Sequence, residues 1–224
     1  MRRTHVWVLA GVGAALAVVA STVAVIRFGA PDGERDSSGR PQRAAMTDLL
    51  DDPDSLLPHL SAEERQAVGM ATGGELRNLL IVGFYLRDRL SGEPRELRPF
   101  LDALRAYRVP DPGDETAFER VALGDYALGF LARAWAQVGP VTAVESECIE
   151  YAVRGLADPE DTVRLRSASL LTVIQMRRPD SVLPADAQRA LDEATKNDWL
   201  RFELERQMDV LREAARAVGR DLPG

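Results

Sequence analysis

Six carboxylic acids crowd one short stretch of the chain and form its densest group of side chains that could do chemistry. They are Glu145, Glu147, Glu150, Asp158, Glu160 and Asp161. Paired carboxylates perform acid–base catalysis, and clusters of carboxylates bind calcium. However, Glu147 and Glu150 lie three residues apart, on one face of a predicted helix, and the ligand spacing of a calcium loop is missing after Asp158. We therefore predict a solvated acidic face here, in preference to a cation site or a catalytic pair.

The other residue types that usually mark an active site are few and widely separated. The two histidines, His5 and His59, do not form the close pair that a zinc site needs, and Cys148 is the only cysteine. The neighbours of Cys148 at helical spacing are mostly apolar or small, so we predict that it is buried. The sequence contains no Gly-x-Ser-x-Gly elbow, Walker loop or Ser-x-x-Lys motif. These observations predict a protein that is not an enzyme, with no catalytic residue, no metal site and no cofactor.

The elements that must position these groups are predicted to be helices. Between the prolines, apolar residues recur at helical spacing, and no run of residues alternates as a strand would. Ser61 with Glu64 forms a capping box, and Pro94, Pro140 and Pro184 are each predicted to open a helix. The fold class is therefore predicted to be all-α.

The helix breaks recur at regular intervals. The three prolines are separated by 46 and 44 residues, and four similarly placed arginines by 43, 44 and 37 residues. Those arginines are Arg77, Arg120, Arg164 and Arg201. Two helices per unit of this length indicate an α-solenoid. We predict about four antiparallel helix pairs, at 61–90, 95–138, 141–177 and 184–217.

Two helical segments favour a different arrangement of the same helices. Leu79–Leu86 and, apart from Arg133, Ala127–Trp135 are apolar on nearly all sides, as in helices at the centre of a packed body. A compact helical bundle is therefore an alternative to the solenoid.

Residues 156–171 resemble the turn and second helix of a HEAT repeat, with Asp158-Pro159 in the turn and Val163-Arg164 in the helix. Residues 196–201 are a weaker copy. The resemblance implies a ladder between neighbouring repeats, formed by Asp161, Arg164, Asp198 and Arg201. The candidates for exposed contact with a partner are Arg166, Arg177 and Arg178. Tetratricopeptide repeats are the rival family, but their unit of about 34 residues is shorter than every spacing here.

The first 27 residues are predicted to carry a membrane anchor. After a short flank at 1–5, an uncharged and predominantly apolar run at Val6–Ile26, closed by Arg27, is long enough to cross a bilayer. The anchor residues that we expect to face lipid are Val6, Trp7, Leu9, Leu16, Val19, Val23 and Ile26. A cleaved signal peptide is the alternative, although its apolar region is usually only about 7–15 residues long. Turn formers then predict a flexible linker at 28–45, before a helical repeat domain at 46–218 and a tail at 219–224.

Charge indicates the side of the membrane and the class of partner. Arg2 and Arg3, beside the amino terminus, favour an amino terminus in the cytoplasm and an exported body, while Arg35, Arg40 and Arg43 keep the other orientation open. Of the 28 basic residues only three precede residue 28. The rest of the chain therefore contains 25 basic residues and all 35 acidic residues. This acidic balance argues against a nucleic-acid partner.

The function predicted from these features is that of a scaffold or adaptor in the cytoplasmic membrane. Its first helix would contact lipid, and its repeat domain would bind a partner protein. The alternative is an exported module, released from its signal peptide, that binds a small ligand or an envelope polymer.

Overall fold

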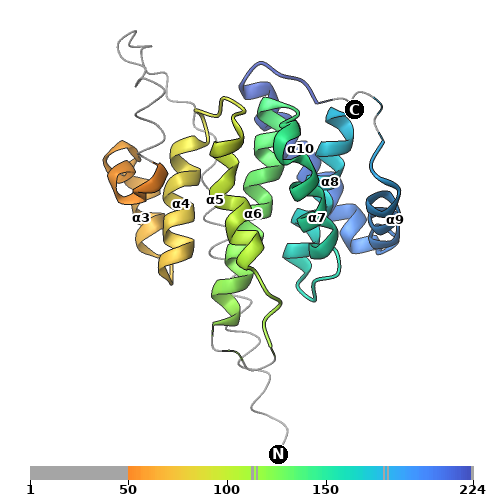
Figure 1. Ribbon diagram of the computed structural model, residues 1–224, viewed down its shortest axis with the longest axis horizontal. Coiled ribbons are helices and arrows are strands. Elements are labelled where there is room, and N and C mark those ends of the chain that lie inside the picture. The colour runs from red at the N-terminus through yellow and green to blue at the C-terminus, as the bar shows by residue number, and fades with distance from the viewer. Residues whose placement is uncertain (1–49, 112–113, 115, 179, 181, 223–224) are drawn as a thin grey trace, which may run out of the picture. The chain divides into compact units, whose positions relative to one another are not determined.

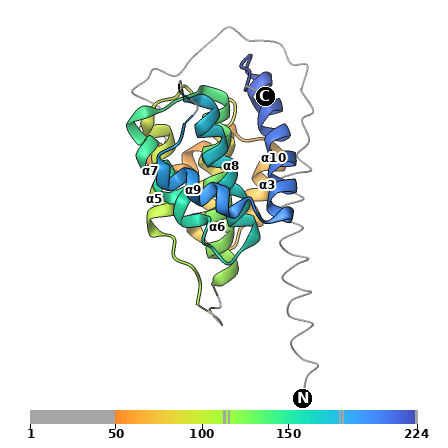
Figure 2. The same cartoon turned by 90° about the vertical axis from the view of Figure 1, so that its right-hand side faces the viewer.

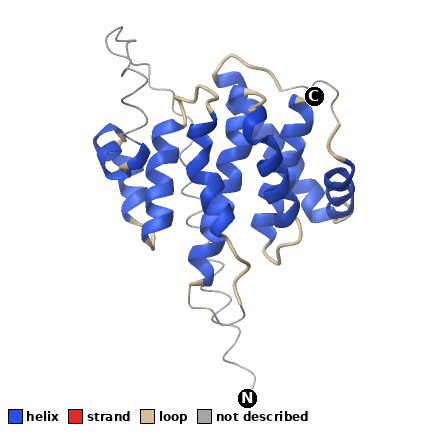
Figure 3. Cartoon of the chain, viewed as in Figure 1, coloured by secondary structure: helices blue, strands red, loops and turns tan. Residues whose placement is uncertain are grey.

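The computed structural model describes residues 50–111, 114, 116–178, 180 and 182–222. These residues form helices and connecting loops without a strand, which confirms the predicted all-α class for this part of the chain (Figure 1, Figure 3). The predicted flank at 1–5, anchor at 6–27 and linker at 28–45 lie outside the described residues. Among the helices that the structure describes, none is both long enough and apolar enough to cross a bilayer.

The helices succeed one another with short connections. Their bounds are η1 Pro53–His59, α3 Ala62–Gly69, α4 Gly74–Leu86, α5 Pro94–Ala106, α6 Ala117–Val138, η2 Thr142–Val144, α7 Glu145–Gly155, α8 Asp161–Arg177, α9 Ala185–Ala194 and α10 Asp198–Ala217. Each of the four predicted units contains two successive α-helices of this series.

Two of the four predicted helix starts are confirmed. The Ser61 hydroxyl accepts a hydrogen bond from the Glu64 backbone N–H at 3.2 Å, and the Glu64 carboxylate accepts one from the Ser61 N–H at 2.7 Å. This is the predicted capping box at the start of α3. Pro94 likewise occupies the first position of α5.

The other two prolines stand at different distances from the next α-helix. Pro184 lies directly before α9, as the residue that caps it. The prediction that Pro140 opens a helix is wrong, because a short 3-10 turn intervenes and α7 begins only at Glu145. Both Val141 and Val144 are buried, and the 3-10 turn between them brings both side chains into the core.

Successive helix pairs stack so that the second helices of neighbouring pairs meet. The second helices α4, α6, α8 and α10 contact one another in this order, and the most extensive contact joins α6 to α8. The first helices α5, α7 and α9 also contact one another in order (Figure 1). The last helix, α10, additionally contacts α6, the second helix of the second pair (Figure 2).

The core is concentrated on α4 and α6, as predicted. All eight residues of Leu79–Leu86 are buried, and Trp135 on α6 has no exposed surface. The ring of Phe130 stacks on Phe100 of α5 with 3.8 Å between centroids. Burial on this scale is the main source of folding free energy, at about 25 cal/mol per Å² of apolar surface.

Two glycines allow neighbouring helices to approach closely. A Cβ atom at Gly83 of α4 would lie 2.2 Å from the Tyr126 hydroxyl of α6. A Cβ atom at Gly155 of α7 would lie 2.2 Å from the Ser167 hydroxyl of α8. Both distances are far below van der Waals contact. The packing of α4 on α6 and of α7 on α8 therefore depends on glycine at these positions.

The first residues of the predicted tail at 219–224 lie against the domain. Leu222 is buried, Arg177 donates to the Asp221 carbonyl at 2.9 Å, and Arg220 donates to the Val138 carbonyl. The sequence contains only one apolar residue here, which is too short a signal to predict docking.

Candidate functional site

The acidic cluster at 145–161 is largely neutralised by arginines. Four of its carboxylates form ion pairs: Glu145 with Arg178, Glu147 with Arg98 and Arg105, Glu150 with Arg154, and Asp161 with Arg164. The residues that the structure describes contain no group of three or more His, Cys, Asp or Glu side chains placed to hold a metal ion. The cluster therefore works as a set of helix–helix and local ion pairs in this part of the chain.

The four residues expected to form an inter-repeat ladder are paired within their own turns. Arg164 bonds to Asp161 and donates to the Asp158 carbonyl at 2.7 Å, which closes the turn between α7 and α8. Arg201 pairs with Asp198 at 2.8 Å in the first turn of α10, where both side chains are exposed. Among the described residues, no hydrogen bond or ion pair joins the two turns.

The three arginines expected to face a partner are engaged with the domain itself. Arg166 of α8 lies 3.2 Å from Asp125 of α6, and its side chain crosses over Gly129. Arg177 donates to the Ala136 carbonyl, and burial lowers its pKa from the usual value. Arg178 likewise pairs with Glu145 across the start of α7. These contacts join segments far apart in the chain, which sequence spacing alone does not indicate.

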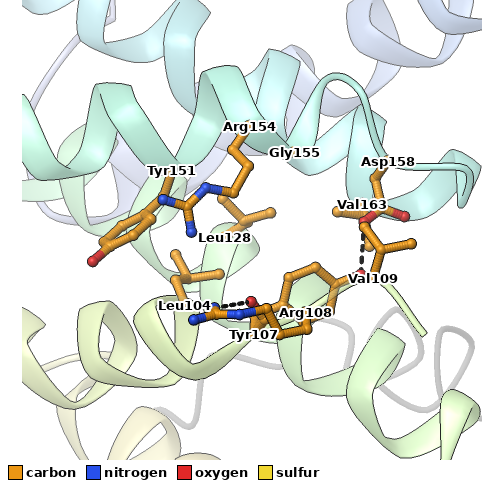
Figure 4. A pocket seen from close by; sticks show the side chains of 10 residues that line it. All are labelled: Leu104, Tyr107, Arg108, Val109, Leu128, Tyr151, Arg154, Gly155, Asp158 and Val163. Carbon is orange, nitrogen blue, oxygen red and sulfur yellow. Dashed lines mark hydrogen bonds between the residues drawn. The ribbon is translucent and has the colours of Figure 1, made fainter. Parts of the chain in front are cut away.

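A cavity lies where α5, α6, α7 and the α7–α8 turn meet (Figure 4). Its volume is about 410 Å³. The lining residues are Leu104, Tyr107, Arg108, Val109, Leu128, Tyr151, Arg154, Gly155, Asp158 and Val163. Leu104, Leu128 and Val163 are buried and form an apolar floor, whereas the polar residues stand around it.

One end of the cavity is closed by a hydrogen bond between the half-buried Tyr107 and the buried Asp158. The Tyr107 hydroxyl donates to Oδ2 of Asp158 at 2.7 Å, and Oδ1 of Asp158 accepts from the Glu160 N–H at 2.9 Å. Burial and this hydrogen bond raise the pKa of Tyr107 above its ordinary value. Both carboxylate oxygens of Asp158 therefore have protein partners, and Tyr107 stays a neutral donor.

The other end of the cavity carries guanidinium groups. Arg154 of α7 and Arg108 of the loop after α5 reach toward the cavity from opposite sides (Figure 4). Arg154 lies over the Tyr151 ring, 5.2 Å from its centroid, and Arg108 donates to the carbonyls of Arg105 and Tyr107 at 2.8 and 2.7 Å. Beside this edge Arg105 pairs with Asp102 and Glu147, and Arg154 pairs with Glu150, so Arg108 carries the charge that no ion pair among the described residues offsets.

The groups that line the cavity decide what chemistry it could do. Within the described lining there is no nucleophile beside a general base, because the one carboxylate, Asp158, is already bonded through both oxygens. An apolar floor with a few directed polar groups is typical of a binding pocket. A charged donor at one end would orient an anionic group of the ligand.

The sequence predicts only part of this pocket. The sequence predicts Asp158 in a turn, but nothing in it pairs this residue with Tyr107, which lies 51 positions away. Arg108 and Arg154 were not singled out, since isolated arginines in an acidic chain carry no periodic signal. Comparisons with known protein families, with curated proteins and with solved structures found no match to this chain.

Proposed function

We propose that this chain is a membrane-anchored adaptor whose helical domain binds a partner protein near the membrane. In this proposal residues 6–27 form a single-pass anchor in the cytoplasmic membrane, and the domain beyond the linker lies on the exported side. The uncharged run at Val6–Ile26 and the arginines Arg2 and Arg3 support the anchor and its direction.

The proposed fold of the domain is a short HEAT-like α-solenoid with a compact end. The stacking of second helices on second helices, from α4 through α6 to α8, supports it. The contact of α10 with α6 accounts for the compact end, because it joins the last helix to the second helix pair.

The observation that carries the binding role is the cavity between α5, α6 and α7. It combines a buried apolar floor with arginines at its edge, and Val109, which is 50% exposed, lies at its rim. Apolar anchor points beside arginines are typical of protein-binding surfaces.

Site-directed photo-cross-linking tests this function. A benzophenone amino acid replaces Val109 at the cavity, or Val182, which is 55% exposed and does not line it, in the full chain expressed in its own membranes. We expect a reproducible protein adduct from position 109 and a much weaker one from position 182. Equal adducts at both positions, or adducts with lipid alone, would overturn the adaptor function.

A second candidate is an exported module for a small ligand, and the size of the cavity favours it. A volume of about 410 Å³ falls within the range of small-molecule sites, about 300–1,000 Å³. The mass of the mature protein distinguishes the two candidate functions. A cleaved exported module would begin after the apolar run, whereas an anchored adaptor would retain that run.

A further inference from the structure

We infer that the cavity between α5, α6 and α7 takes the carboxyl-terminal residue of a partner polypeptide. Its last side chain, which is apolar, fills the floor, and its α-carboxylate lies between the guanidinium groups of Arg108 and Arg154. This inference rests on the proposed adaptor function and names the part of the partner that the cavity recognises.

Arg108 has donors left for a carboxylate. Both of its hydrogen bonds, at 2.8 and 2.7 Å, come from Nη1 and go to backbone carbonyls, which fixes the side chain without neutralising it. No carboxylate of the described residues forms an ion pair with Arg108. A guanidinium has five N–H donors, so Nη2 and Nε stay available to a ligand.

Arg154 is held in place only by exposed and weak interactions. Its Nη2 lies 2.9 Å from Glu150, one turn away on α7, and the side chains of this pair are 50% and 67% exposed. Such an exposed pair contributes little to stability, so an incoming carboxylate can share or replace Glu150 at small cost. The Tyr151 ring beneath the guanidinium keeps it at the edge of the cavity.

The floor and the far end of the cavity define the rest of the ligand. Leu104, Leu128 and Val163 are at most 4% exposed and offer only apolar surface. At the far end Asp158 is 3% exposed and carries a negative charge with both oxygens bonded. A ligand carboxylate is therefore repelled from that end and attracted to the arginine end.

A chain terminus satisfies these requirements better than an internal segment. The terminal residue carries its side chain and its carboxylate on one Cα atom, so both reach their sites while the chain leaves through the open rim at Val109. An internal segment would have to pass the closed end formed by Tyr107 and Asp158.

Fluorescence anisotropy of the full chain in detergent micelles provides the test. The probe is a fluorescein-labelled pool of hexapeptides with five random positions and a final leucine, made as the free acid and, for comparison, as the amide. We expect the free-acid pool to bind at least ten-fold more tightly than the amide pool, because a carboxylate bonded to guanidinium groups is lost on amidation. Arg108→Gln and Arg154→Gln should each weaken the free-acid pool about ten-fold and leave the melting temperature unchanged.

The matched control is Arg189→Gln on α9, which removes an exposed arginine that does not line the cavity and should leave binding unchanged. Equal binding of acid and amide pools, or equal loss with Arg189→Gln, overturns the inference. Full displacement of the peptide pool by octanoate at the same concentration also overturns the inference, since a simple fatty acid would then bind the cavity as well as a peptide does. A Val109 adduct together with equal binding of both pools leaves the adaptor function standing while this inference fails.

Discussion

The Tyr107 hydroxyl lies 2.7 Å from Oδ2 of Asp158, and this hydrogen bond joins the end of α5 to the α7–α8 turn. Asp158 is 3% exposed, and its other oxygen accepts from the Glu160 N–H. The same two residues close one end of the cavity, so the bond belongs both to the stability of the domain and to the shape of its pocket.

Removing this bond should destabilise the domain. Tyr107→Phe takes the donor from a buried carboxylate, and we expect a loss of about 1–3 kcal/mol in the free energy of unfolding. Urea denaturation followed by circular dichroism measures it. The control is Tyr126→Phe, because the structure gives the Tyr126 hydroxyl no hydrogen bond with a described residue. Equal losses in the two variants would show that the bond to Asp158 adds nothing.

The contact between Gly83 and Tyr126 should be intolerant of one methyl group. A Cβ atom at position 83 would lie 2.2 Å from the Tyr126 hydroxyl, so Gly83→Ala forces the ring or the helices apart. We expect a loss of about 1–3 kcal/mol by thermal or urea unfolding.

Two further variants check the cause of that loss. Gly69→Ala, where nothing lies within 4 Å, should be neutral or should stabilise α3 by about 0.5–1 kcal/mol. Adding Tyr126→Phe to Gly83→Ala should restore part of the stability, because the nearest ring atom then lies 3.0 Å away. No recovery in the double variant would contradict the steric explanation.

The contacts of Tyr107 with Asp158 and of Gly83 with Tyr126 are of a kind that the sequence does not predict. The all-α class, the capping box at Ser61 and the burial of Cys148 follow from local spacing, and the structure confirms them. Pairings such as Gly83 with Tyr126 depend on how helices stack. A helical pattern repeats every 3.6 residues and tells which face is buried, but not which residue of another helix it meets.

The candidate pocket is not predictable from the sequence for a related physical reason. Charged clusters are the strongest signal in the sequence, which predicts that Arg166, Arg177 and Arg178 are exposed. In the structure these arginines bond to groups at least 33 positions away and hold helices together. A long arginine side chain can reach either solvent or a distant carbonyl, and the local pattern is the same in both cases.

A buried carboxylate at the start of α5 should be one of the strongest single stabilising groups. Glu96 has no exposed surface, and its oxygens accept from the backbone N–H groups of Ser91, Gly92 and Glu93 at 3.0–3.3 Å and from the Ser91 hydroxyl at 2.7 Å. Glu96→Ala leaves these donors without a partner, so we expect a loss of about 3 kcal/mol in urea denaturation. Glu75→Ala, an exposed acid in the first turn of α4, should cost less than about 1 kcal/mol. Similar costs for the two variants would mean that solvent replaces the carboxylate of Glu96.

The Cys148 thiol should be unreactive in the folded domain. It should also make the free energy of unfolding decrease at alkaline pH. Burial raises the pKa of this thiol from about 9 to about 12, so at pH 8 the folded protein presents almost no thiolate. A thiol reagent such as dithionitrobenzoate should react slowly with the native chain and rapidly in urea. Rapid labelling of the native chain at pH 8 would contradict this burial.

The same shift in pKa sets the sign of the pH dependence. Between pH 9 and 12 the unfolded thiol has lost a proton that the folded thiol keeps, so stability is fully present below pH 9 and is lost as pH rises toward 12. Tyr107 and Tyr126, whose pKa values burial also raises, act in the same direction above pH 10. In Cys148→Ser the free energy of unfolding should fall less steeply over pH 9–11, by up to about 1.4 kcal/mol per pH unit. Parallel curves for the two proteins would show that the thiol ionises equally readily in both states.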